Sequence, residues 1–128
     1  MQADLFRDAL SLESVLRALR DCVGAAHGLT ARALVLRITG RRSGAGERRL
    51  RQIVETLRLA GHPVCGHPSH GYYMAANADE LAQTCQFLVS RSMTSLQQVR
   101  AMKRVTLPDL LGQLALSIGA NHEHESHE

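Results

Sequence analysis

The spacing of apolar residues predicts a first amphipathic helix near the N-terminus. It begins at Ser11 or Glu13, and residues 3–10 before it are expected to form a short helix or a loose arm. Its apolar positions recur three or four residues apart, as the buried face of a helix requires. They are Leu12, Val15, Leu16, Leu19 and Val23. Gly24 and Gly28 bracket the end of this helix.

Residues 31–39 are expected to form a second helix. Thr30 precedes them, and its hydroxyl can accept a hydrogen bond from a backbone N–H group of the first turn. Gly40 follows, where a left-handed conformation is easy only for glycine. The alternative is a buried strand, because residues 34–36 are a short apolar run. The threonine cap, the alanines and the terminal glycine favour the helix.

A third helix is predicted from about Gly46 to Ala60. Leu50, Ile53, Val54 and Leu57 form a stripe at helical spacing, and Gly61 and Pro63 mark its end. A polar connection over residues 40–47 separates it from the second helix.

Residues 63–76 predict a β-hairpin, because two short β-like runs flank a Pro-Ser-His-Gly turn. A capping box at Asn77 and Glu80 then opens a long helix that runs to about Arg104. Its seam alternates steps of four and three, as Leu81, Cys85, Leu88, Ser92, Ser95, Val99 and Met102. A helix roughly 40 Å long exceeds what a small core can cover. Part of it must therefore pack on a partner, fold back or stay exposed.

Pro108 opens a last short helix from Asp109 to Ile118, and residues 120–128 are a polar tail expected to be disordered. The domain organisation that follows is a helical domain with a hairpin over residues 1–76, a helical segment over residues 77–119 and the tail. The fold class is mainly α with a small β-hairpin: a winged helix-turn-helix followed by a long C-terminal helix.

Charge is concentrated in one segment of this 128-residue chain. Residues 32–58 carry a net charge of +6 against −3 for all the others, which gives the total of +3. A cationic patch of this kind is typical of a surface that meets phosphates. The alternative is a solvated helix face, since a chain with fourteen Arg and one Lys fits a GC-rich genome.

Other classes of protein are disfavoured by the sequence. No stretch is apolar enough for a membrane span, and the N-terminus does not resemble a secretory signal. Three widely spaced cysteines predict a reducing cytoplasm, that of a bacterial host if the chain is phage-encoded. No nucleophile signature or carboxylate pair stands out, so neither an enzyme nor a cofactor is expected.

A zinc site is the main alternative for the hairpin. His62, Cys65, His67 and His70 offer four potential ligands within nine residues, and zinc takes four nitrogen or sulfur ligands. Alternation along a strand would place these side chains on both faces, which disfavours the site.

Residues 13–104 resemble phage-encoded winged-helix DNA-binding proteins. The matching stretches are residues 29–34, 38–40, 49–64 and 71–75. The connection over residues 40–47 departs from the family, in which the turn is tighter. The resemblance implies double-stranded DNA binding in phage replication or transcriptional control.

The third helix is then the element expected to enter the major groove. Its outward side chains, Arg48, Arg49, Arg51 and Gln52, are the predicted base readers, because Arg can pair with guanine and Gln with adenine. The predicted phosphate contacts are Arg41, Arg42, Ser43, Thr30 and Arg32, and those of the wing are His67, Ser69 and His70. The alternative function is a protein-interaction adaptor that uses the helix over residues 77–104. A homodimer or a replication-protein partner on that helix fits either function.

Overall fold

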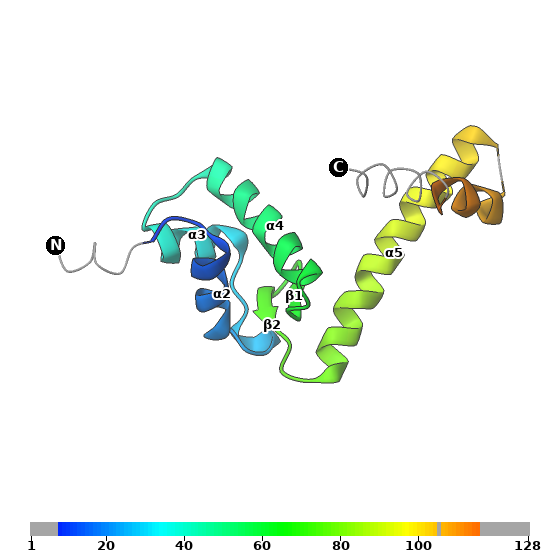
Figure 1. Cartoon of the computed structure of the whole chain (residues 1–128). Coiled ribbons are helices and arrows are strands. Elements are labelled where there is room, and N and C mark those ends of the chain that lie inside the picture. The colour runs from blue at the N-terminus through cyan, green and yellow to red at the C-terminus, as the bar shows by residue number, and fades with distance from the viewer. Residues whose placement is uncertain (1–7, 105, 116–128) are drawn as a thin grey trace, which may run out of the picture. The chain divides into compact units, whose positions relative to one another are not determined.

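The computed structural model describes residues 8–104 and 106–115, which are mainly helical with a small two-stranded antiparallel sheet (Figure 1). The elements are α2 (Leu12–Arg20), the 3-10 turn η1 (Ala25–His27), α3 (Ala31–Thr39), α4 (Gly44–Leu59), β1 (Val64–His67), β2 (Gly71–Met74) and α5 (Ala78–Lys103). The predicted mainly helical fold with a hairpin and a long C-terminal helix is confirmed. Contacts divide the chain into two compact units after Cys85, within α5.

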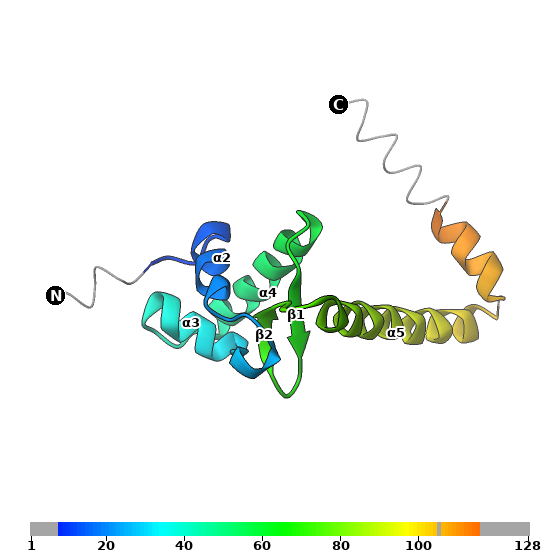
Figure 2. The same ribbon diagram turned by 90° about the horizontal axis from the view of Figure 1, so that it is seen from below.

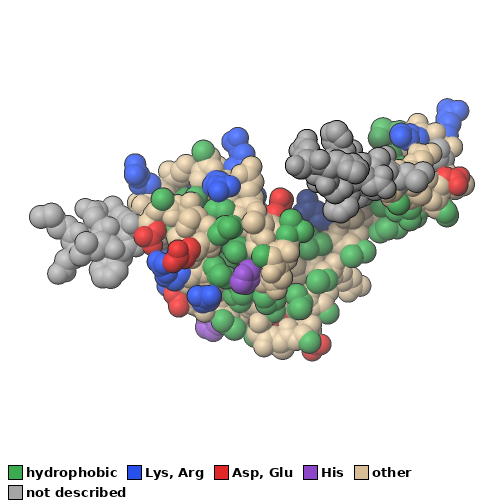
Figure 3. Space-filling model, viewed as in Figure 1, with side chains coloured by type: hydrophobic (Ala, Val, Ile, Leu, Met, Phe, Trp, Pro, Cys, Tyr) green, Lys and Arg blue, Asp and Glu red, His purple; other side chains and the backbone are tan. Residues whose placement is uncertain are grey.

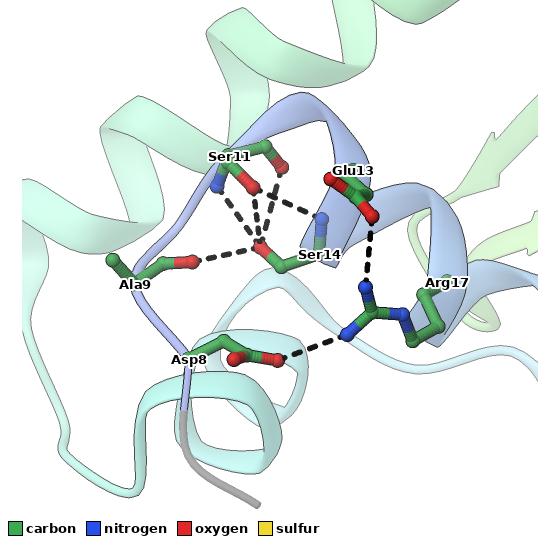
Figure 4. Close-up of polar contacts among 6 residues, drawn as sticks. All are labelled: Asp8, Ala9, Ser11, Glu13, Ser14 and Arg17. Atoms are coloured by element: carbon green, nitrogen blue, oxygen red, sulfur yellow. Dashed lines mark hydrogen bonds and ion pairs between the residues drawn. The ribbon is translucent and has the colours of Figure 1, made fainter.

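The start of α2 is fixed by a set of short polar contacts (Figure 4). The backbone N–H of Ser14 donates to Ser11 Oγ at 3.0 Å, and the backbone N–H of Ser11 donates to Ser14 Oγ at 2.9 Å. Arg17 is paired with Asp8 at 3.2 Å and with Glu13 at 3.1 Å. These groups satisfy one another, so we interpret the shallow hollow that they line as a helix cap and not as a binding site.

The expectation that α2 reaches Val23 is wrong, because the helix ends at Arg20. Val23 lies beyond it and forms an isolated bridge with Met74. The backbone N–H of Met74 donates to the carbonyl of Cys22 at 2.7 Å, and that of Gly24 donates to the carbonyl of Met74 at 2.9 Å. Pairing with β2 thus replaces a further turn of helix.

Helices α3 and α4 are joined by a tight connection of four residues, Gly40 to Ser43. As predicted, the backbone N–H of Ala33 donates to Thr30 Oγ1, and Gly40 has a φ of 77°. The expected longer connection over residues 40–47 is wrong. The hydroxyl of Ser43 accepts from the N–H of Gly46 at 2.9 Å and starts α4 at Gly44.

The core of the first unit lies where α2, α3 and α4 meet. The predicted α4 stripe is fully buried, and Val15, Leu19, Leu34 and Val35 pack in the same cluster. A Cβ at Gly46 would lie 3.0 Å from Val35 Cγ1, so the first turn of α4 runs close to α3. Burying each large aliphatic side chain stabilises the fold by about 1.5–3 kcal/mol.

The hairpin is attached to the helices at its base. Strands β1 and β2 pair with Cys65 opposite Tyr73 and His67 opposite Gly71. Leu29 forms a bridge with Tyr72, with backbone hydrogen bonds of 3.0 and 2.7 Å in the two directions. Figure 2 shows the hairpin beside the segment that leads into α3. The hairpin and α3 are therefore parts of one body.

A second, smaller cluster lies beneath the hairpin and contains Cys22, Cys65 and Tyr73. Burial raises the pKa of both thiols and of the Tyr73 hydroxyl. Cys85, in contrast, is exposed on α5.

The long helix predicted over residues 77–104 is observed as α5. The backbone N–H of Glu80 donates to Asn77 Oδ1 at 2.9 Å, as a capping residue requires. The Glu80 carboxylate instead accepts from the N–H groups of Ala76 at 2.8 Å and Ala25 at 3.0 Å. The expected capping box is therefore only half formed, because Glu80 ties η1 to the segment before α5.

Residues 107–115 form the last described helix, and the hydroxyl of Thr106 accepts from the N–H of Asp109. Residues 116–118 of the predicted last helix, residues 3–7 of the predicted arm and the predicted tail lie outside the described residues. None of the described helices combines the length and the apolar character needed to cross a bilayer.

Gly71 provides a test of the attachment between hairpin and α3. Its φ is 73°, and a Cβ there would lie 2.4 Å from the carbonyl carbon of Leu29. We expect Gly71→Ala to lower the free energy of unfolding by about 2 kcal/mol or more, measured by urea denaturation. Gly44→Ala is the control, because nothing lies within 4 Å of its Cβ and α4 already begins there. It should change stability by less than about 1 kcal/mol. Equal effects of the two substitutions would contradict the attachment.

Glu80 predicts a pH dependence of stability. Hydrogen bonds from the backbone N–H groups of Ala76 and Ala25 lower the pKa of its carboxyl. The carboxylate therefore stabilises the fold above the unfolded-state pKa, about 4.3, and this contribution is lost as the pH falls through the folded-state pKa. Glu80→Gln should reduce stability at pH 7 and have a smaller effect in acid. Glu55→Gln, at an exposed position of α4, serves as the control. An equal loss from Glu80→Gln at both pH values would refute the mechanism.

Candidate nucleic-acid interface

The predicted base-reading residues lie on the solvent side of α4. Arg48, Arg49, Arg51 and Gln52 are all exposed, whereas the stripe on the opposite side of the helix is buried. At about 100° per residue, Arg48 and Gln52 point directly away from the core. Arg49 and Arg51 lie on the two flanks, about 160° apart. The four side chains thus span the whole outward face and do not form a single row.

Figure 3 shows arginine side chains projecting from the edge of the first unit that α4 and the preceding loop form. Arg51 lies 4.0 Å from Glu47, and Arg37 lies 3.9 Å from Asp21. Both pairs are long and partly exposed, so they neutralise little charge. Among the described residues, no carboxylate lies within 4.0 Å of Arg32, Arg41, Arg42, Arg48 or Arg49.

The predicted phosphate contacts lie at the N-terminal ends of α3 and α4. Arg41, Arg42 and Ser43 are exposed in the connection, and Thr39 Oγ1 anchors that connection by accepting from the N–H of Arg41 at 3.2 Å. Thr30 and Arg32 are exposed at the beginning of α3. The hydroxyls of Ser43 and Thr30 both accept from backbone N–H groups, which leaves each hydroxyl proton available to a ligand.

Arg58 counts toward the basic segment but has a structural position. Its Nε donates to the carbonyl of Val64 at 2.7 Å, and its side chain is half-buried. A Cβ at Gly66 would lie 3.1 Å from Arg58 Nη2. Arg58 therefore fastens the end of α4 to β1 and contributes less charge to the exposed face than its position in the sequence suggests.

The predicted wing residues His67, Ser69 and His70 are exposed at the hairpin turn. The two histidine rings lie 5.0 Å apart, measured between centroids. The backbone N–H of Ser69 donates to His67 Nδ1 at 3.0 Å, so the Nε2 atom of the neutral ring carries the proton. The turn thus presents nitrogen donors to solvent.

The structure does not bring together His62, Cys65, His67 and His70, the four residues of the zinc alternative. Cys65 is fully buried against Cys22 and Tyr73, whereas His67 and His70 are exposed at the turn. No group of three or more potential ligands is assembled within the part of the chain that the structure describes. Position along the hairpin separates the side chains, because Cys65 lies in its buried part and His67 and His70 lie at its exposed turn.

Two residues of the outward face were not singled out from the sequence. Leu59 is 90 % exposed and lies on the same side of α4 as Arg48 and Gln52. Glu55 is exposed between them. The sequence does carry a signal for Leu59, because a leucine two positions after the last stripe residue lies on the polar side of the helix.

The chain matches no family model, no curated protein and no solved structure in the comparisons made. The resemblance to phage-encoded winged-helix proteins therefore stays a prediction.

Proposed function

We propose that this protein binds double-stranded DNA as a winged helix-turn-helix, with α3 and α4 as the helix pair and the β1–β2 hairpin as the wing. The observation that carries the proposal is the exposed face of Arg and Gln side chains on α4, opposite its buried stripe. A major groove admits one α-helix, and such a helix must show polar groups outward while its other side is held by a core.

Two features of the first unit support this arrangement. The connection between α3 and α4 is short, as in helix-turn-helix pairs, and it carries two exposed arginines. The hairpin is bonded through Tyr72 to Leu29, directly before α3. A wing fixed in this way can contact DNA in register with the helix pair.

The proposed roles divide by position. In this proposal Arg48, Arg49, Arg51 and Gln52 read base edges, and the exposed Leu59 contacts a thymine methyl group. Arg41, Arg42, Ser43, Thr30 and Arg32 contact phosphates, which fix the register of the protein but carry no sequence information. The biological setting in this proposal is phage replication or transcriptional control.

The second candidate function is a protein-interaction adaptor that uses α5. The observation that favours it is the set of exposed apolar side chains on that helix, including Leu81, Phe87, Leu88 and Val89. Retention of a protein partner after nuclease treatment, together with no affinity for duplex DNA, would favour this function.

Substitutions on α4 test base reading. A duplex selected from a random pool and an arbitrary duplex of equal length serve as ligands in fluorescence anisotropy titrations. We expect Arg48→Ala, Arg49→Ala or Arg51→Ala to weaken binding to the selected duplex by about 1–3 kcal/mol and to relax preference at one base pair. Arg17→Ala, on α2, is the matched control. Unchanged affinity in both Arg49→Ala and Arg51→Ala would overturn the assignment.

Substitutions in the connection test phosphate contact. Arg41→Ala and Arg42→Ala should weaken binding to the selected and the arbitrary duplex equally, because phosphates are the same in both. Each should also reduce the slope of log affinity against log salt concentration by about 1. The measurement is the same titration at several salt concentrations. An unchanged slope would exclude these arginines as phosphate ligands.

A further inference from the structure

The second unit leaves most of its apolar side chains uncovered. Leu110 is its one buried large hydrophobic residue among residues 86–104 and 106–115. The exposed ones are Phe87, Leu88, Val89, Met102, Leu111 and Leu114, each at least 38 % accessible. The part of α5 after Cys85 and the helix over residues 107–115 bury so little surface that packing contributes little to their stability. Something else must cover this surface.

Several uncovered residues of α5 form a regular seam, whereas Phe87 and Val89 lie about 100° to either side of Leu88. Leu81, Cys85, Leu88, Ser92, Ser95 and Met102 are exposed, and Val99 is half-buried. The steps of four and three between them are those of the contact line in a coiled coil. Small side chains in the middle, at Ser92 and Ser95, let a second helix approach closely there.

The charges on α5 indicate which kind of partner helix can pack against this seam. Its first turn is acidic, with Asp79 and Glu80, and its last turn is basic, with Arg100 and Lys103. A second copy running antiparallel places acidic ends beside basic ends and opposes the helix dipoles, whereas a parallel copy places like charges together. The spacing fits this arrangement, because copies that cross at Ser92 put Cys85 opposite Val99 and Leu88 opposite Leu96.

We propose that a second copy of this chain covers the seam, so that α5 forms an antiparallel homodimer centred on Ser92. The proposal goes beyond DNA binding and does not rest on it. It requires only that α5 is one continuous helix whose exposed seam faces its symmetry mate.

Disulfide trapping of the full chain tests the geometry without DNA. In a Cys85→Ser background, Ser92→Cys should link two chains under oxidised glutathione, because the two positions meet at the symmetry axis. Ser90→Cys in the same background is the matched control. It lies about 160° around the helix and should not link. The unaltered chain should not link through Cys85 either, since antiparallel copies hold those thiols far apart. Linkage through Cys85, or equal linkage at positions 90 and 92, would overturn the proposal.

Sedimentation equilibrium of nuclease-treated protein provides the second measurement. The mass should rise from monomer to dimer between about 1 and 500 µM. Leu88→Glu should raise the dissociation constant at least about 100-fold, because it places an unpaired charge in the seam. A monomer across the whole range would refute the dimer and would favour a partner of different sequence on α5. A dimer that binds no duplex DNA would refute the proposed function alone.

Discussion

The first unit depends on one backbone contact, the pairing of Leu29 with Tyr72. It joins the hairpin to the segment before α3, and it forms only because the chain approaches itself closely at Gly28 and Gly71. A Cβ at Gly28 would lie 2.0 Å from the carbonyl oxygen of His70. The neighbouring hydrogen bonds of Met74 with Cys22 and Gly24 extend the contact toward α2. Without these backbone bonds and the hydrogen bond of Arg58 to Val64 the sheet would be an isolated hairpin, which is marginally stable in water.

Much of the fold could be predicted because it depends on interactions between residues that are close in the sequence. The stripe of α4, the Thr30 and Gly40 caps and the length of α5 follow from spacing and from residues that act on their immediate neighbours. The length of the α3–α4 connection was overestimated although its cap, Ser43, is local. Two other errors fall where distant segments compete with local ones. α2 ends before Val23 because the backbone groups that follow it pair with β2. The Glu80 carboxylate does not complete the cap of α5 but accepts a hydrogen bond from Ala25, fifty-five residues away.

The candidate interface divides in the same way. Exposure of Arg48, Arg49 and Gln52 follows from the buried stripe, because a helix that buries one side must show the other. Sequence spacing also allows the contact of Arg51 with Glu47, four residues apart. Arg58 could not be assigned this way, since its bond to the carbonyl of Val64 depends on how β1 returns along α4. Charge counted along a chain therefore overstates the charge that a surface presents.

The positions of the three cysteines allow local unfolding of the first unit to be followed by thiol labelling. Cys22 and Cys65 lie beneath the hairpin as protonated thiols, and only Cys85 is exposed. Thiolates, not thiols, react with alkylating reagents, and solvent access is needed as well. Modification of Cys85 should therefore be fast, while that of the other two waits for the hairpin to separate from the helices. The slow phase of such labelling would measure how often the first unit opens, without any added probe.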